Sequence, residues 1–200
     1  KEFNKKMRES SVSGKNWVSK NFNEETVDFL KENFQLSEIV SKLLAIRKIK
    51  IDEVKLFLNP KIKNLLPNPF VLKDMDKTVK RTIKAIENKD KIGIFGDYDV
   101  DGATSTALLG NYFNEIKQTS QIYIPDRKTE GYGPSKLGFE KLITSGSKII
   151  FTVDCGTLSF ETIQYAYQKN IDVIVLDHHQ SELKLPKAFS VVNPNRYDDN

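Results

Sequence analysis

The chain has 200 residues, of which 38% are hydrophobic and 29% charged, so it can build a folded core and lacks the composition of a disordered protein. No run of about 18 apolar residues occurs, which excludes a membrane-spanning helix, and we expect no secretory signal in the charged first ten residues. The single cysteine, Cys155, excludes a disulfide framework within the chain and favours a reducing cytoplasm.

The charge is unevenly distributed along the chain. Residues 1–90 hold 20 basic and 13 acidic residues, whereas residues 91–200 hold 11 basic and 14 acidic residues. A basic first part can attract a polyanion and an acidic second part can hold cations. A solvated helical surface explains the same distribution, so the charge pattern leaves both interpretations open.

The first part of the chain predicts a small helical region, residues 1–70, which begins with a loose polar arm at residues 1–16. Apolar residues then recur at helical spacing in three segments. Ser37 is expected to cap the second helix, and the third stops before Pro60. The three predicted helices cover residues 24–34, 37–46 and 52–58.

The second part, residues 71–200, predicts an α/β fold with a parallel sheet and flanking helices. Short apolar runs alternate with helix-length segments, which is typical of βαβ units. Because the runs are almost continuously apolar, we expect both faces of the sheet to be covered. The predicted strands are 91–95, 121–125, 147–153 and 172–176, and the predicted helices are 74–86, 103–117, 135–145 and 159–169.

Ionisable residues follow every predicted strand. In open α/β sheets the ligand site lies beyond the carboxyl ends of the strands, so we expect these side chains to converge. In strand order they are Asp97, Asp99 and Asp101; Asp126 and Arg127; Asp154; and Asp177, His178 and His179.

Three aspartates at alternate positions, Asp97, Asp99 and Asp101, repel one another unless protons, cations or hydrogen-bond donors accompany them. Hard divalent cations take oxygen ligands, and Asp154 with His178 could complete the coordination. Mixed carboxylate and imidazole ligation suits Mn²⁺, with Mg²⁺ a second choice. Five ligands exceed the needs of one ion. We therefore predict two ions that share a carboxylate, an arrangement that serves in-line phosphoryl displacement.

The aspartate motif has other interpretations. Asp97, Asp99, Asp101 and Gly102 match the start of an EF-hand loop, but Leu108 stands where that loop has its glutamate. No Gly-Lys-Ser/Thr phosphate loop occurs. A nucleotide-binding fold with one magnesium ion stays open. A set of solvated turns also stays open, although ionisable residues at three strand ends disfavour this interpretation.

Two residues near the second predicted strand are candidates for substrate contacts. Tyr132, in an exposed turn with Gly133, could stack on a base, and Arg127 could hold a phosphate. A packed loop aromatic and a surface salt bridge explain the same residues. Cys155 is interpreted as a small buried side chain.

Six stretches resemble the DHH phosphoesterase superfamily, and within it a branch of bacterial single-stranded-DNA-specific exonucleases. They are NPFVLKDMDK (68–77), GDYDVDG with its helix (96–109), PDRKTEGYG (125–133), VDCG (153–156), LDHH (176–179) and VVNPNR (191–196). Members that act on small substrates usually carry histidine where this chain has Asp97, which favours the exonuclease branch.

The resemblance implies 5′-to-3′ hydrolysis of single-stranded DNA in repair and recombination, dependent on Mn²⁺ or Mg²⁺. It also implies single-stranded DNA as a partner, together with a single-stranded-DNA-binding protein and a helicase, and no membrane. A fourth motif, a C-terminal domain and an oligonucleotide-binding barrel would lie beyond Asn200. We therefore expect residues 71–200 to be an incomplete DHH domain of a longer nuclease, and weak or inactive in isolation.

The resemblance also assigns roles to single residues. Asp97 and Asp99 would serve one metal ion, Asp101 and His178 the other, and Asp154 would bridge them. His179 would contact the scissile phosphate or help to protonate the leaving group. The residues expected to hold the strand are Arg127, Tyr132 and Gly133.

Two other functions remain open from the sequence. One is a DHH phosphoesterase that acts on short oligonucleotides or cyclic dinucleotides, and the other is a non-catalytic scaffold with the same fold. Asp97 and the helical region argue against the first, and the intact set of aspartates and histidines argues against the second.

Overall fold

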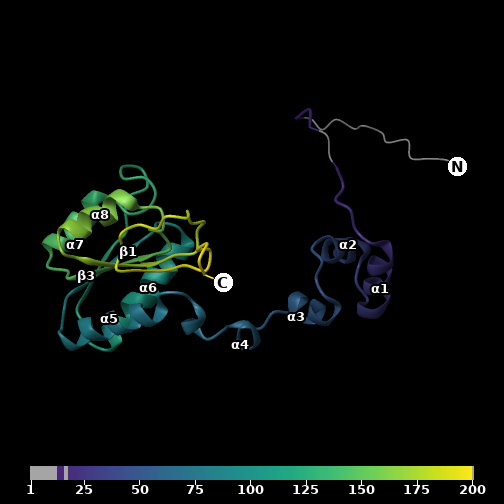
Figure 1. The fold of residues 1–200 in the computed structure, drawn as a ribbon, viewed down its shortest axis with the longest axis horizontal. Helices are drawn as coiled ribbons and strands as arrows, with labels where there is room; N and C mark the ends of the chain where they lie inside the picture. Colours follow the sequence, from purple (N-terminus) through teal and green to yellow (C-terminus); the bar gives the residue numbers. More distant parts are fainter. Residues whose placement is uncertain (1–12, 16–17, 200) are drawn as a thin grey trace. The chain divides into compact units, whose positions relative to one another are not determined.

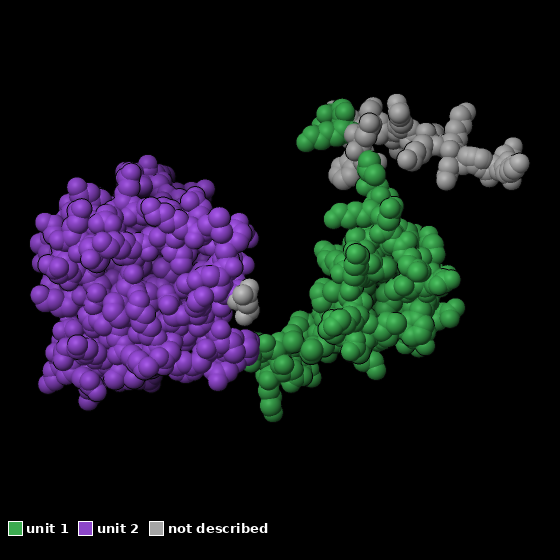
Figure 2. All heavy atoms as spheres, in the orientation of Figure 1, with its two compact units in different colours: residues 1–66 green, residues 67–200 purple. Residues whose placement is uncertain are grey.

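The computed structural model describes residues 13–15 and 18–199, so most of the arm predicted over residues 1–16 lies outside the described residues. The chain divides into two compact units, Lys1–Leu66 and Pro67–Asn200 (Figure 2). In the described part of the chain, no helix has the length and apolar character needed to cross a membrane.

The first unit is helical, as the sequence predicts. Asn23 caps α1 by accepting a hydrogen bond from the Thr26 amide, and Ser37 caps α2 in the same way. The third predicted helix begins with a 3₁₀ turn, Ile51–Glu53, and α4 is too short to show a periodic pattern. The helices are α1 (Glu24–Phe34), α2 (Glu38–Ile46), α3 (Val54–Leu58) and α4 (Ile62–Leu65).

The second unit contains a five-stranded parallel sheet, which confirms the predicted α/β fold (Figure 1). The strands lie in the order β2-β1-β3-β4-β5, and β5 was not predicted because it has only three residues. The strands are β1 (Ile92–Gly96), β2 (Ser120–Tyr123), β3 (Ile149–Val153), β4 (Asp172–Leu176) and β5 (Ser190–Val192). The flanking helices are α5 (Met75–Glu87), α6 (Val100–Glu115), α7 (Lys136–Thr144) and α8 (Phe160–Gln168).

Helices cover both faces of this sheet (Figure 1). On β1, Phe95 packs with Phe139 and Ile163 of α7 and α8, whereas Ile92 and Ile94 belong to a second cluster that includes Ala85 and Phe113 of α5 and α6. Successive side chains of a strand point to opposite faces, so an apolar run supplies both clusters at once.

The strand order defines where a ligand can bind. After β1 the chain crosses to β2 on one side and then returns to β3 on the other side of β1. Adjacent crossovers that run in opposite directions open a crevice at the carboxyl ends of the strands. The residues that follow β1, β3 and β4 lie at this edge.

Helix α6 ends in a conformation that favours glycine. Lys117 has a φ of 58°, and the next amide, that of Gln118, bonds back to the Phe113 carbonyl at 2.8 Å. This is the Schellman arrangement, in which a residue with a side chain is strained.

We expect Lys117→Gly to raise the free energy of unfolding by about 0.5–1 kcal/mol, since relief of that strain exceeds the added freedom of the unfolded chain. The measurement is urea unfolding. The matched control is Lys84→Gly, at an exposed position in the middle of α5, which should lower the free energy of unfolding by about 1 kcal/mol. Equal losses in both variants would contradict the expectation.

Candidate metal centre

The end of β1 places two aspartates around the start of α6. Asp97 is fully buried, and Asp99 caps α6 by accepting a hydrogen bond from the Gly102 amide at 2.9 Å. A Cβ on Gly102 would lie 2.5 Å from the Asp97 carbonyl oxygen. The helix can therefore begin this close to Asp97 only because residue 102 is glycine.

The end of β3 places Asp154 in an uncommon backbone conformation. Its φ is 62°, in the left-handed region that aspartate tolerates better than most residues. The Asp154 amide bonds to the Leu176 carbonyl at 2.9 Å, which extends the ladder between β3 and β4 by one step. The residue is 7% exposed at the carboxyl edge of the sheet.

The end of β4 carries Asp177, His178 and His179, and Asp177 organises the turn. Its Oδ1 accepts hydrogen bonds from the His178 amide at 2.7 Å and from His179 Nδ1 at 2.8 Å. Its Oδ2 accepts one from the Thr157 amide at 2.9 Å. Both oxygens of Asp177 are therefore occupied within the protein, and the bond to Nδ1 orients the His179 ring.

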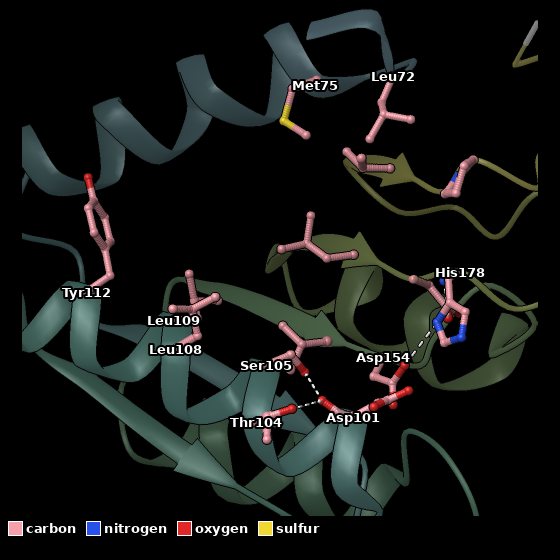
Figure 3. Close-up of a pocket in the computed structure, with 15 residues that line it drawn as sticks. Leu72, Met75, Asp101, Thr104, Ser105, Leu108, Leu109, Tyr112, Asp154 and His178 are labelled. Atoms are coloured by element: carbon pink, nitrogen blue, oxygen red, sulfur yellow. Dashed lines mark hydrogen bonds and ion pairs between the residues drawn. The ribbon is translucent and has the colours of Figure 1, made fainter. Parts of the chain in front are cut away.

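The three strand ends form two overlapping groups of potential metal ligands. One ligand atom from each of Asp97, Asp99 and Asp154 lies within 4.8 Å of the others, and the same holds for Asp154 with Asp177, His178 and His179. Asp154 is common to both groups, and its Oδ1 lies 3.1 Å from His178 Nδ1 (Figure 3).

Asp101 is more exposed than Asp97 and Asp154. It is exposed on the first turn of α6 and is not part of either group of ligand atoms found among the described residues. Its side chain lines the open side of a cavity next to Asp154 and His178 (Figure 3). The predicted role of Asp101, as a ligand of the second ion with His178, stays a prediction, since only Asp97 and Asp99 of the three aspartates belong to a group of ligand atoms among the described residues.

Two buried oxygens show that the site fits a cation. Asp97 Oδ2 and Asp154 Oδ2 have no hydrogen-bond partner in the protein. Burial raises the pKa of both carboxyls above its usual value, and the neighbouring Asp99 raises the pKa of Asp154 further. The other oxygen of each carboxylate has a partner, because Asp97 Oδ1 accepts the Tyr98 amide and Asp154 Oδ1 lies 3.1 Å from His178 Nδ1. A divalent ion at the two unpartnered Oδ2 atoms would offset the remaining cost of burying them.

The surrounding groups have pKa values shifted in other directions. The Gly102 amide lowers the pKa of Asp99. Burial opposes ionisation of Asp177, but hydrogen bonds from Thr157 and His179 outweigh it and lower its pKa. The bond to Asp177 raises the pKa of His179. Asp99 and Asp177 are thus held as carboxylates, next to an imidazole that readily accepts a proton.

Of the predicted substrate residues, Tyr132 contacts His179 directly. The Tyr132 hydroxyl is 3.0 Å from His179 Nε2, and the Tyr132 ring meets Tyr98 edge-on at 6.4 Å. The exposed Arg127 guanidinium lies 5.2 Å from the centre of the Tyr98 ring. Gly133 has a φ of 78°, which explains glycine in this turn. Tyr132 therefore contacts the histidine turn directly, whereas Arg127 is connected to Tyr132 by way of the Tyr98 ring.

Two hollows flank the centre. The larger, about 1040 Å³, extends from Asp154 and His178 along Leu108, Leu109 and Tyr112 of α6 (Figure 3). The smaller, about 490 Å³, lies beyond His179 and Tyr132 and is also lined by residues that follow β3. An extended ligand could therefore continue from the centre on either side of the two histidines.

Several residues of the site received no role from the sequence. Tyr98 lies inside the aspartate motif, but its contact with Arg127 depends on the fold. Asp177 was noted as ionisable, yet sequence cannot show that its oxygens are already hydrogen-bonded. Asn193 belongs to a stretch that resembles the family, and that resemblance was the only available signal.

Comparison with known proteins identifies the class. The family model described as "DHH family, N-terminal domain" matches residues 91–200, which contain every residue of the centre. The chain therefore belongs to the DHH family.

Within that family the chain is similar to exonucleases. The single-stranded-DNA-specific exonuclease RecJ of Bacillus subtilis (strain 168) is 34% identical over 179 residues, which cover 89% of this chain and 23% of the relative. RecJ of Escherichia coli (strain K12) is 33% identical over 178 residues, 88% of this chain and 30% of the relative. The chain thus spans less than a third of the length of these two relatives.

Solved structures agree with the fold. A crystal structure of exonuclease RecJ bound to manganese superposes with a TM-score of 0.57 at 29% identity, over 64% of this chain and 33% of that one. The structure of RecJ in complex with Mn²⁺ from Thermus thermophilus superposes with a TM-score of 0.61 over 86% of this chain and 24% of that one. At 21% identity, the second comparison supports the fold alone.

We expect Asp154→Asn to stabilise the chain in a chelator and to abolish stabilisation by Mn²⁺. The change removes a buried charge while asparagine tolerates the left-handed backbone, so the free energy of unfolding should rise by about 1 kcal/mol. Thermal unfolding with and without Mn²⁺ measures both effects. The control is Glu161→Gln, which makes the same change of charge at an exposed position of α8 and should keep the response to Mn²⁺. A manganese response retained by Asp154→Asn would show that Asp154 is not a ligand.

Proposed function

We propose that this chain is the metal-binding part of a nuclease that hydrolyses single-stranded DNA from its 5′ end, in DNA repair and recombination. The observation that carries the proposal is the pair of buried, unpartnered oxygens of Asp97 and Asp154 at adjacent strand ends. The names of the exonuclease relatives support the substrate, and the manganese in the solved relatives supports the ion.

In this proposal Asp97, Asp99 and Asp154 hold one divalent ion, and Asp154 with His178 holds a second. Manganese or magnesium bound there would supply positive charge to the attacking water and the leaving oxygen. Asp101 remains a sequence-based prediction for the second ion, since it lies outside both groups of ligand atoms among the described residues.

His179 is proposed as the residue that contacts the scissile phosphate or delivers a proton to the leaving group. A carboxylate can only accept a hydrogen bond, so the Asp177 bond places a proton on Nδ1 of His179. Nε2 is then the atom that exchanges a proton on the side of Tyr132 and the substrate loop. Asp177 acts here through His179 and not on the substrate.

The strand itself is proposed to lie against Arg127, Tyr132 and Gly133. The Arg127 guanidinium is exposed and lies over the Tyr98 ring, and its N–H groups are proposed to bind a phosphate of the strand. The ring of Tyr132 offers a stacking surface for a base, and positive φ at Gly133 shapes the turn.

The whole protein is proposed to be longer than this chain. Residues 1–70 would form its helical N-terminal region and residues 71–200 an incomplete DHH domain, which would be weakly active or inactive without the remainder. A cytoplasmic location, a single-stranded-DNA-binding protein and a helicase as partners belong to the same proposal.

The test is a time course with Mn²⁺ on the complete reading frame, using single strands labelled at either end, duplex DNA and dinucleotides. We expect immediate release of a labelled mononucleotide from the 5′-labelled single strand only. Rapid hydrolysis of dinucleotides with long strands untouched would instead assign the protein to the phosphoesterases of small substrates.

Arg127→Ala is expected to raise KM for single-stranded DNA about 10-fold or more, with kcat changed less, because a charge-assisted contact to phosphate contributes roughly 1.5–3 kcal/mol. The measurement is steady-state kinetics on the complete protein. Lys128→Ala removes the adjacent exposed charge and is the control for general electrostatic attraction. Equal effects of the two substitutions would remove the specific role of Arg127.

A further inference from the structure

The turn that carries the two histidines is held by a segment beyond it in the chain. Pairing between β4 and β5 ends at Leu176 and Val192, and the last backbone bond runs from the Asp177 amide to the Val192 carbonyl at 3.1 Å. The carbonyls of His178 and His179 therefore lie beyond the ladder. They are bound instead by the side-chain amides of Asn195 and Asn193.

Asn193 is fully buried and all of its side-chain groups are satisfied. Its Nδ2 donates to the His179 carbonyl at 3.0 Å and to Thr157 Oγ1 at 2.8 Å, and its Oδ1 accepts from the Asn195 amide at 2.8 Å. A carbonyl oxygen only accepts, so the His179 bond fixes which way the amide of Asn193 faces.

A second connection joins Asn193 to the ring of His179. Thr157, which accepts from Asn193, donates its own amide to Asp177 Oδ2, and Asp177 Oδ1 binds His179 Nδ1. Asn193 therefore binds the backbone carbonyl of His179 directly. It is also connected to the ring of His179 through Thr157 and Asp177. These contacts join the loops that follow β3, β4 and β5.

Arg196 anchors the segment that carries Asn193 and Asn195 to the rest of the unit. The residue is buried, and Nη1 donates to Asp74 Oδ2 at 3.0 Å and to the Val191 carbonyl at 2.5 Å. Nε and Nη2 bind the carboxylate of Asp198. The two asparagines therefore project from a segment that is anchored to the start of α5, not from a free loop.

We propose that Asn193 and Asn195 are positioning residues that set the direction of the His178 and His179 side chains in the metal centre. The inference rests on the proposed function, in which His178 is a ligand and His179 acts on the substrate. Removal of a residue that hydrogen-bonds a metal ligand typically lowers metal affinity or activity by about 10- to 100-fold.

The test uses this chain, whose only histidines are His178 and His179, so imidazole ¹H–¹⁵N spectra report on the two rings alone. Asn195→Ala removes an exposed side chain, and Asn193→Asp keeps the shape of the buried one while losing its donor. We expect both to shift imidazole signals and to raise the Kd for Mn²⁺ by about 10-fold.

The control is Thr78→Val, which removes a buried hydrogen bond of 2.7 Å to Ser190 of β5 without touching the histidine turn. It should reduce stability and leave the imidazole signals and the Kd unchanged. Asparagine variants with unchanged signals and a Kd within twofold of the parent would overturn the inference and make the segment purely structural. If Asn193→Asp does not fold, the imidazole signals and the Kd for Mn²⁺ of Asn195→Ala test the inference.

Failure of the two proposals can be distinguished. A parent chain that binds no Mn²⁺ would contradict the proposed metal centre. The imidazole spectra in chelator would still show whether the asparagines orient the two rings.

Discussion

The repulsion between carboxylates at one edge of the sheet is the constraint on which the rest of the site depends. Asp97 and Asp154 are buried, each with one oxygen that no group of the protein binds, and Asp99 belongs to the same group of ligand atoms. Burial alone makes such a cluster unfavourable. The fold tolerates it because the cost is confined to a small region of a well-packed sheet, and because a cation can offset it.

The geometry around the cluster is adapted to the same constraint. Gly102 lets α6 start against Asp97, and Asp154 adopts a left-handed backbone directly after a buried strand. In contrast, Asp177 has both oxygens bound by the Thr157 amide, the His178 amide and the His179 ring. Neighbouring aspartates therefore differ in how their oxygens are bound: Asp97 and Asp154 each keep one unpartnered oxygen, whereas both oxygens of Asp177 accept hydrogen bonds from the protein.

Much of the second unit could be predicted from the sequence, because a strand covered on both faces has to be apolar along its whole length. The runs ending at Gly96, Val153 and Leu176 show this pattern, and the acidic residues that follow them indicated the edge of the site. The three-residue β5 was too short for the pattern to show. The exposed position of Asp101 and the contact of Tyr98 with Arg127 depend on how α6 leaves the sheet and on the fold of a distant loop. Spacing in the sequence contains neither.

The bond from Arg196 to Asp74 joins residues 122 positions apart and has a consequence for how the unit forms during synthesis. A nascent chain that has emerged only as far as His179 already contains the aspartates and histidines of the two groups of ligand atoms described above. It still lacks the asparagines that bind the two histidine carbonyls and the arginine that anchors them. Contacts of such long range form late, because the intervening chain must first be ordered. The candidate ligand residues are therefore translated before the segment that holds the histidine turn, and the hydrogen bonds of that turn are complete only after β5 and the residues up to Arg196 have left the ribosome.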